Sequence, residues 1–329
     1  MESPKQTLVT GAGGFIGSHL VEALVDQGQR VRALVHYNSR SDPGMLGELA
    51  GEHLRHVEIV SGDIRDPFLV RRAVQGCDCV FHLAALIGVP YSYVAPADYV
   101  AVNVVGTTHV LQACLDEGVA RVVHVSTSEV YGSARRVPVD EEHPLQGQSP
   151  YAASKIGGEK LAEAFHRSFG CPVVVVRPFN AYGPRQSARA LIPTVIAQVL
   201  DGGSIRLGAL DPVRDFTFVR DTVAGLVAVG LSAGAVGEVV NLGSGRGTAV
   251  ADIVRLVAQA LGAGEVRVTE DAARLRPAAS EVTRLIADSS LAHRLCGWEP
   301  MTSLEEGLAT TIDWVRAHRD RFKAAVYAI

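Results

Sequence analysis

The chain has 329 residues, of which 47% are hydrophobic and 20% charged, so it can bury a sizeable core, and wholesale disorder is excluded. A net charge of −4 argues against a nucleic-acid binder or a polybasic membrane-surface protein, and no stretch approaches the ~20 apolar residues that cross a bilayer. The five scattered cysteines form no C-x-x-C pair, which indicates reduced thiols and no structural zinc.

The chain runs almost at once into its first expected strand. Residues 1–5 precede that strand and leave no room for a signal peptide, so we expect a cytoplasmic protein.

Short β-branched runs alternate with longer amphipathic segments through the first half of the chain. The expected strands are Thr7–Thr10, Val31–Val35, Val57–Val60, Cys79–His82, Val122–Ser126 and Val173–Val176. The expected helices between them are Ile16–Gln27, Pro67–Gln75, Tyr99–Glu117 and Tyr151–Phe169. This alternation predicts an α/β fold with a Rossmann-type, doubly wound parallel sheet.

The rhythm changes after Asn180, where segments become shorter and richer in glycine and proline. Helices are expected again at Ala249–Leu261, Ser289–Cys296 and Leu304–Ala317. At roughly 150 residues per domain, we expect a dinucleotide-binding domain over 1–180 and a smaller C-terminal α/β substrate lobe over 181–329. That lobe is expected to be partly interleaved with the first domain.

A glycine-rich turn follows the first strand and opens the first helix. Gly11 permits the tight turn, Gly14 lets the backbone approach a pyrophosphate, and Gly17 lets the helix lie close on the sheet. Phe15 and Ile16 begin the helix, whose free N–H groups favour an anion. The pattern predicts dinucleotide binding, and the alternative is an ordinary glycine-rich turn. Its G-x-x-G-x-x-G spacing resembles the short-chain dehydrogenase/reductase superfamily.

That resemblance assigns further cofactor contacts after strands three and four. Asp63 and Ile64 resemble the family's adenine contact, although Asp63 could instead cap the helix that starts at Pro67. The small-residue turn under the cofactor would be formed by Leu83, Ala84 and Ala85.

The end of strand two would normally carry an acidic residue for the ribose hydroxyl, but here no carboxylate appears. The ribose contacts would instead come from His36, Asn38 and Arg40, and an arginine could tolerate a 2′-phosphate. The cofactor is therefore expected to be NAD or NADP, with the choice open. His36 could equally be a surface residue.

Tyr151 and Lys155 lie four residues apart at the start of a helix, so they share one helical face. A neighbouring ammonium favours a phenolate and lowers the pKa of tyrosine, which could then take the proton of a sugar hydroxyl. Taken alone, the Tyr-x-x-x-Lys spacing is common by chance, and the alternative is an ordinary pair of surface residues. Together with the glycine turn it matches the short-chain dehydrogenase pattern.

Thr127, Ser128 and Glu129 follow strand five, and ligands of parallel sheets bind beyond the carboxyl ends of strands. Thr127 could hydrogen-bond the hydroxyl that is oxidised. Glu129 could abstract the C5 proton of a 4-keto hexose and let the C6 hydroxyl leave as water, although it could instead be a solvated charge.

These motifs together resemble the extended short-chain dehydrogenases that act on nucleotide sugars, and Thr-x-Glu resembles the 4,6-dehydratases among them. Many 4,6-dehydratases have aspartate in the middle of this triplet, but this chain has Ser128, as the GDP-mannose-type dehydratases do. A serine hydroxyl is a poor proton donor, which suggests that Glu129 carries the proton both ways. Nearly the whole chain resembles the NDP-N-acetylhexosamine 4,6-dehydratases of legionaminic-acid-type pathways. That subgroup implies UDP-N-acetylglucosamine, or its GDP equivalent, as substrate.

The resemblance also assigns residues around the catalytic pair. Guanidinium groups suit a nucleotide diphosphate, and the substrate candidates are Asn180, Arg185, Leu191, Arg214 and Arg276. Arg214 could instead form a local ion pair with Asp215. Asn103 and Pro178 complete the cofactor site, although Asn103 could be an ordinary polar group inside a helix.

The sequence therefore predicts an enzyme, an NAD(P)-dependent nucleotide-sugar 4,6-dehydratase, with no metal and with a nucleotide-diphosphate sugar as its ligand. The alternatives are a nucleotide-sugar 4-epimerase, a UDP-glucuronate-type decarboxylase and a cofactor-binding sensor without turnover. The family resemblance implies a homodimer built on the helices of Tyr99–Glu117 and Tyr151–Phe169.

Overall fold

A seven-stranded sheet, in which every neighbouring pair of strands is parallel, forms the centre of the computed structural model, which describes residues 6–202 and 204–322. Its strand order is β10-β6-β5-β4-β1-β2-β3. The strands are β1 Gln6–Thr10, β2 Arg30–His36, β3 Val57–Gly62, β4 Cys79–His82, β5 Arg121–Val125, β6 Val173–Pro178 and β10 Val239–Leu242. Residues 1–5, on which the expectation of no signal peptide depends, lie outside the described residues.

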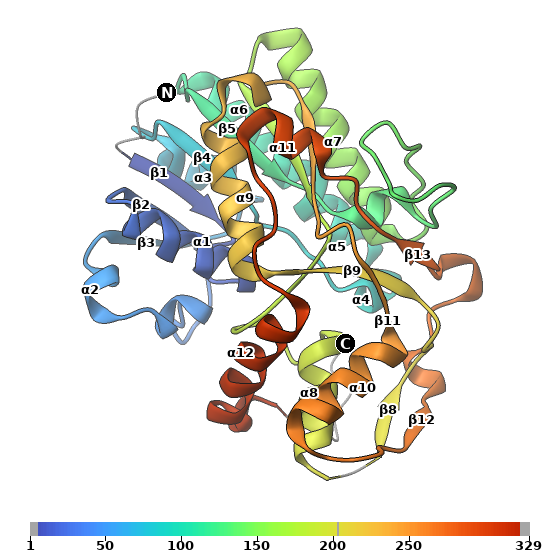
Figure 1. The fold of residues 1–329 in the computed structure, drawn as a ribbon. Coiled ribbons are helices and arrows are strands. Elements are labelled where there is room, and N and C mark those ends of the chain that lie inside the picture. The colour runs from blue at the N-terminus through green and yellow to red at the C-terminus, as the bar shows by residue number, and fades with distance from the viewer. Residues whose placement is uncertain (1–5, 203, 323–329) are drawn as a thin grey trace.

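Helices cover both faces of this sheet (Figure 1). One face packs against α3 (Pro67–Val74), α6 (Thr107–Asp116) and α7 (Pro150–Phe169). The other face packs against α1 (Phe15–Asp26) and α9 (Val219–Leu231). Neighbouring strand residues such as Leu8 and Val9 point to opposite faces, and both are fully buried. The predicted doubly wound sheet is confirmed.

The helix expected over Tyr99–Glu117 is interrupted. The chain forms α5 (Pro96–Val100), then a π-helical turn over Ala101–Gly106, and only then α6. Short helices also occur at α2 (Gly51–Leu54) and α4 (Val89–Val94). π-helical turns are frequent at functional sites, and this one carries the buried side chain of Asn103.

The second lobe contains two small sheets and the helices that pack on them. Around β9 (Val213–Phe218) lie β7, β11 and β13, at Asn180–Tyr182, Gly247–Ala249 and Arg284–Leu285. A separate pair joins β8 (Ile205–Leu207) to β12 (Val268–Glu270). The lobe's helices are α8 Leu191–Leu200, α10 Val250–Leu261 and α12 Leu304–Ala317, whereas α11 (Ser290–Cys296) packs on α9 and β10 at the main sheet (Figure 1).

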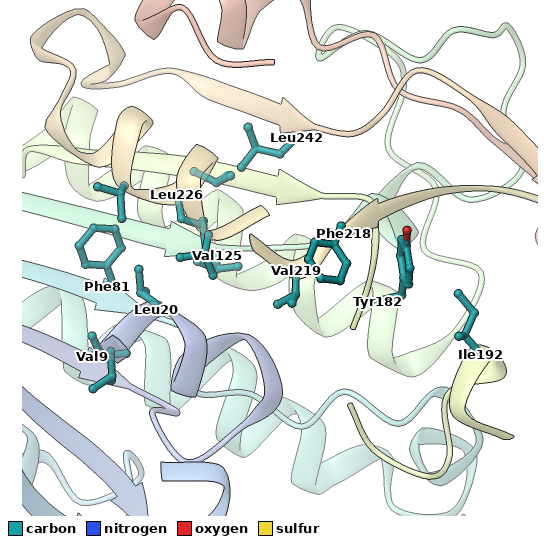
Figure 2. Close-up of a cluster of buried hydrophobic side chains, with 14 of the residues drawn as sticks. Val9, Leu20, Phe81, Val125, Tyr182, Ile192, Phe218, Val219, Leu226 and Leu242 are labelled. Carbon is teal, nitrogen blue, oxygen red and sulfur yellow. The ribbon is translucent and has the colours of Figure 1, made fainter. Parts of the chain in front are cut away.

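The two lobes are joined by chain segments that pass between them and by one continuous hydrophobic core. After β9 the chain returns to the main sheet as α9 and β10, where β10 pairs with β6. Figure 2 shows buried side chains running from the sheet into the second lobe without a break: Val9, Leu20, Phe81, Leu226, Val219, Phe218, Tyr182 and Ile192. No helix in the described part of the chain is long and apolar enough to cross a membrane.

Candidate active site

A cavity of about 920 Å³ lies at the carboxyl ends of the sheet strands and extends into the second lobe. It borders the gap between β1 and β4, where the strand order reverses, which is the usual ligand site of an open α/β sheet. The predicted residues that line it are Gly11, Gly14, Phe15, Ile16, Gly17, His36, Asn38, Leu83, Ala84, Ala85, Thr127, Glu129, Tyr151, Lys155, Pro178, Asn180, Leu191, Arg214 and Arg276.

The glycine turn fits a dinucleotide. Gly11 adopts φ +69°, and a Cβ there would lie 2.8 Å from the Ala84 backbone nitrogen. A Cβ on Gly17 would collide with the Gly11 carbonyl oxygen. Gly14 is the N-cap of α1 and makes no side-chain hydrogen bond, and the first turn of α1 holds no acidic residue. The N–H groups of that first turn can therefore donate to a phosphate.

A buried hydrogen-bond chain supports the turn after β4. The Ala84 N–H donates to Thr10 Oγ1 (3.1 Å), which lies 2.8 Å from His82 Nδ1. His82 Nε2 lies 3.0 Å from Thr107 Oγ1. Because Thr107 Oγ1 donates to the Asn103 carbonyl, it accepts from His82 Nε2–H. In the neutral imidazole, Nδ1 then accepts from the Thr10 hydroxyl. Burial lowers the pKa of His82 to about 3, in agreement with that assignment.

The Asn103 side chain joins this turn to the catalytic helix. It accepts from the Leu86 N–H (2.8 Å) and donates to the Leu86 carbonyl (2.9 Å) and to Ser154 Oγ (2.9 Å). Asn103 therefore lies behind the cavity wall and ties Leu86 to α7. Asn103 is not among the cavity-lining residues, so the prediction that it completes the cofactor site is wrong.

The end of the cavity expected to hold the adenine and its ribose differs from the prediction in three residues. Arg40, Asp63 and Ile64 are not among the cavity-lining residues. Asn38 accepts the backbone N–H of Arg40 (3.1 Å) and of Asp42 (3.0 Å), and this turn brings Asp42 to the cavity instead. His36 is exposed as well as cavity-lining.

Asp63 and Ile64 have structural partners. The Asp63 carboxylate pairs with Arg65 at 2.6 Å and with His36 at 3.5 Å. It does not cap α3, because Asp66 accepts the Phe68 N–H there, so that alternative is also wrong. Ile64 is buried in the hydrophobic core.

The catalytic candidates meet where β5 ends and α7 begins. Thr127 caps a short 3-10 helix over Ser128–Tyr131 by accepting the Glu129 N–H (3.2 Å). Lys155 Nζ donates to the Val125 carbonyl (2.8 Å). Ser128 is buried and is not among the lining residues, unlike its two neighbours.

The pKa of Tyr151 is raised, not lowered as we expected from Lys155. Burial is the main cause, and the Glu129 carboxylate adds to it, while a hydrogen bond with Thr127 lowers it. Burial also lowers the pKa of Lys155 to about 8. The expectation is wrong for the chain's own residues because burial opposes both charged forms.

Charged side chains from the second lobe form the far end of the cavity. Arg276 Nη1 lies 3.1 Å from Glu129 Oε2, and Arg214 Nη2 lies 3.4 Å from Glu281 Oε1. Asp215 does not pair with Arg214, because it accepts hydrogen bonds from the N–H groups of residues 244, 245 and 287.

Arg185 is not a lining residue, since it pairs with Glu22 of α1 at 2.9 Å. Asp42 and Glu281 line the cavity but were not predicted as site residues. No motif marks them, because each reaches the cavity through a loop.

Within 6–202 and 204–322 no cluster of three or more His, Cys, Asp or Glu side chains could hold a metal ion.

A Rossmann-type sheet whose glycine turn and Tyr-x-x-x-Lys pair face one cavity defines a short-chain dehydrogenase/reductase. Residues 8–311 match the model of the family described as GDP-mannose 4,6 dehydratase. The chain belongs to this family, and the expectation of an NAD(P)-dependent enzyme of the nucleotide-sugar dehydratase and epimerase group is confirmed.

Three similar proteins illustrate the relationship. A dTDP-glucose 4,6-dehydratase of Streptomyces griseus is 39% identical over 328 residues, which cover 98% of this chain and 97% of that protein. DesIV, a dTDP-glucose 4,6-dehydratase from Streptomyces venezuelae solved with NAD and TYD bound, has a TM-score of 0.86 and 35% identity, covering 97% of this chain and 99% of that one. TunA, an NAD-dependent NDP-hexosamine 5,6-dehydratase involved in tunicamycin biosynthesis, has a TM-score of 0.85 and 35% identity, covering 96% and 100%. Nucleotide-sugar 4-epimerases of known structure match as well.

Proposed function

We propose that this enzyme converts an NDP-hexosamine, with UDP-N-acetylglucosamine as the first candidate, into its 4-keto-6-deoxy derivative. One observation carries the proposal: the Glu129 carboxylate lines the same cavity as the Tyr151 phenol and the Lys155 ammonium. Oxidation alone needs only a tyrosine, a lysine and a hydroxyl. Removal of water across C5–C6 needs a further proton-transfer group, which Glu129 can provide.

The first step would remove the proton of the C4 hydroxyl. Tyr151 would accept it, while Thr127 orients the hydroxyl. When bound, NAD would supply the hydride acceptor for C4 and the hydride donor for C6, and its positive charge would favour ionisation of the phenol. Lys155 would be held against the Val125 carbonyl, beside the ribose.

The second step would use Glu129. A carbonyl at C4 acidifies C5–H, because the resulting carbanion is delocalised onto oxygen. Glu129 would take that proton and pass a proton to the C6 hydroxyl, which leaves as water. Once the hydride is on C6, Glu129 would take a new proton from solvent and pass it to C5, while Tyr151 releases the C4 hydroxyl proton to solvent. One water is then lost and the cofactor ends oxidised. Since Ser128 is buried behind the wall, Glu129 would carry the proton in both directions.

The nucleotide would lie toward the second lobe. Arg214 and Arg276 present guanidinium groups that suit a diphosphate, and Asn180 and Leu191 line the same region. Substrate preference for the amino sugar rests on the family resemblance. The homodimer and the cytoplasmic location expected from the sequence stay predictions.

The test is an NMR assay in heavy water with UDP-N-acetylglucosamine and, in parallel, dTDP-glucose. A 4,6-dehydratase produces a new C6 methyl group and carries solvent deuterium at C5. Turnover of dTDP-glucose alone would contradict the hexosamine part of the proposal and leave the dehydration intact. A 6-deoxy product without deuterium at C5 would contradict the role of Glu129.

Variants separate the steps. Glu129→Gln should keep cofactor binding yet stall before water is lost, whereas Tyr151→Phe should fail at oxidation. Full turnover by Glu129→Gln would refute the proposed mechanism. Cofactor content, read from the absorbance of the released nucleotide, confirms that each variant is folded and loaded.

A 4-epimerase is the second candidate. Glu129 is ion-paired with Arg276, and an epimerase needs only the remaining residues of the wall. In the same assay an epimerase inverts C4 without incorporating solvent deuterium.

A further inference from the structure

The carboxylate that would act as the base is already engaged by a cation from the other lobe. Arg276 Nη1 and Glu129 Oε2 are 3.1 Å apart, and their side chains are 24% and 12% exposed. The two residues are 147 positions apart in the chain. Because the pair is partly buried, it is screened less than an ordinary surface ion pair.

A second ion pair lies in the same cluster. Arg214 and Glu281 are 3.4 Å apart, so the two pairs together bring two guanidinium groups and two carboxylates to the cavity wall. The two arginines repel each other, and Glu129 attracts both. A diphosphate that enters this cluster therefore competes with Glu129 and Glu281 for the same two cations.

The backbone around Arg276 is anchored on both sides. Before it, the Asp271 N–H donates to the Leu207 carbonyl of β8 (2.7 Å). After it, Ser280 Oγ donates to the Gln148 carbonyl and contacts the Tyr93 hydroxyl, both at 2.5 Å. An exchange of partners by Arg276 would therefore involve its side chain and not a movement of the whole segment.

We propose that the Glu129–Arg276 ion pair is an exchangeable lock, in which the diphosphate of the incoming nucleotide takes Arg276 and thereby frees Glu129 for proton transfer. This inference rests on the proposed function, in which Glu129 is the base. While Glu129 Oε2 accepts a hydrogen bond from Arg276, that oxygen is not available to take a proton from carbon. Release by the diphosphate would make Glu129 competent only when a nucleotide-linked sugar is present.

The proposed lock can be tested through nucleoside diphosphate affinity alone, without catalysis. If diphosphate binding must break the pair, then removal of the Glu129 charge strengthens diphosphate binding, and it does so only while Arg276 is present. A double-mutant cycle isolates that coupling from general charge effects.

The experiment is isothermal titration of the NAD-loaded protein with UDP, dTDP and GDP, none of which carries a sugar that could react. Glu129→Gln should bind the preferred nucleoside diphosphate at least about fivefold more tightly than the parent. Arg276→Gln should bind it at least about fivefold more weakly. In the Arg276→Gln background, Glu129→Gln should change affinity by less than about twofold.

Glu22→Gln is the matched control. It removes one carboxylate, but Glu22 pairs with Arg185 outside the cavity wall, so nucleotide affinity should stay at the parent value. Retained NAD content shows that each variant is folded.

Three results would overturn the lock. One is unchanged or weaker binding by Glu129→Gln, and the second is an equal gain in the Arg276→Gln background. The third is that no nucleoside diphosphate binds the parent protein, which would also contradict the substrate class. The first two leave the proposed function intact, because they concern binding and not dehydration.

Discussion

Glu159→Gln should destabilise the protein strongly, because Glu159 neutralises a fully buried arginine. Arg177 on β6 donates three contacts to that carboxylate, at 3.0, 3.2 and 2.6 Å, and its Nη1 also donates to the Tyr131 hydroxyl at 2.8 Å. The side chains of Arg177 and Glu159 are 2% and 0% exposed. Removing one partner leaves an uncompensated charge in a low-dielectric interior.

The expected loss is about 3–5 kcal/mol of unfolding free energy. At about 1.4 kcal/mol per factor of ten, that lowers the ratio of folded to unfolded protein by roughly 10²- to 4 × 10³-fold. Equilibrium urea unfolding of the parent and the variant, followed by circular dichroism, measures the difference.

An exposed pair on the same helix is the control. Lys160 and Glu163 lie 2.7 Å apart, but the lysine is largely solvated, so Glu163→Gln should cost less than about 1 kcal/mol. The double variant Glu159→Leu with Arg177→Met should lose less than Glu159→Gln alone, because no unpaired charge remains. A loss below about 1 kcal/mol for Glu159→Gln, or a double variant that is worse, would refute the reasoning.

Three further predictions concern the cofactor site and a helix cap. Burial lowers the pKa of Lys155 from 10.5 to about 8, so between those values the unfolded chain binds more protons and stability rises with pH. Lys155→Met should lack this rise in the cofactor-free protein; urea unfolding at pH 7.5, 8.5 and 9.5 tests it, and an identical slope in both proteins would contradict it. Gly17→Ala should lose NAD on gel filtration, because its Cβ would meet the Gly11 carbonyl, whereas Gly51→Ala meets nothing within 4 Å and should retain it; retention by both would show that the turn tolerates a side chain. Ser303→Ala breaks the capping box of α12 and should cost about 1 kcal/mol in the same urea assay, and no measurable change would argue against the cap.

Local patterns predicted much of the fold. The strand expected at Cys79–His82 and the helix expected at Leu304–Ala317 agree with β4 and α12 residue for residue. Both segments carry their signal internally, as a buried apolar run or as a cap followed by a helical period. In contrast, α9 and β10 were not predicted. Val219–Leu242 is a largely apolar segment interrupted by glycines, and β10 becomes a strand by pairing with β6, which is distant in the sequence.

The site shows the same division. The glycine turn and the Tyr151–Lys155 pair are defined by spacing within a single element, and the structure brings them together. Arg40 and Arg185 look equally suitable in the sequence, but the loop geometry turns them away from the cavity. The pairing of Glu129 with Arg276 joins opposite lobes, and no pattern within either segment announces it.

The return of the chain through α9 and β10 constrains how this enzyme can diversify. A single recombination crossover near residue 180 would exchange the second lobe together with an edge strand of the main sheet and the helix that packs on α1. A cassette swap between relatives would therefore disrupt the shared interior unless both parents matched there. New substrate preferences are accordingly more accessible through point changes in the loops around the cavity than through the replacement of a whole module.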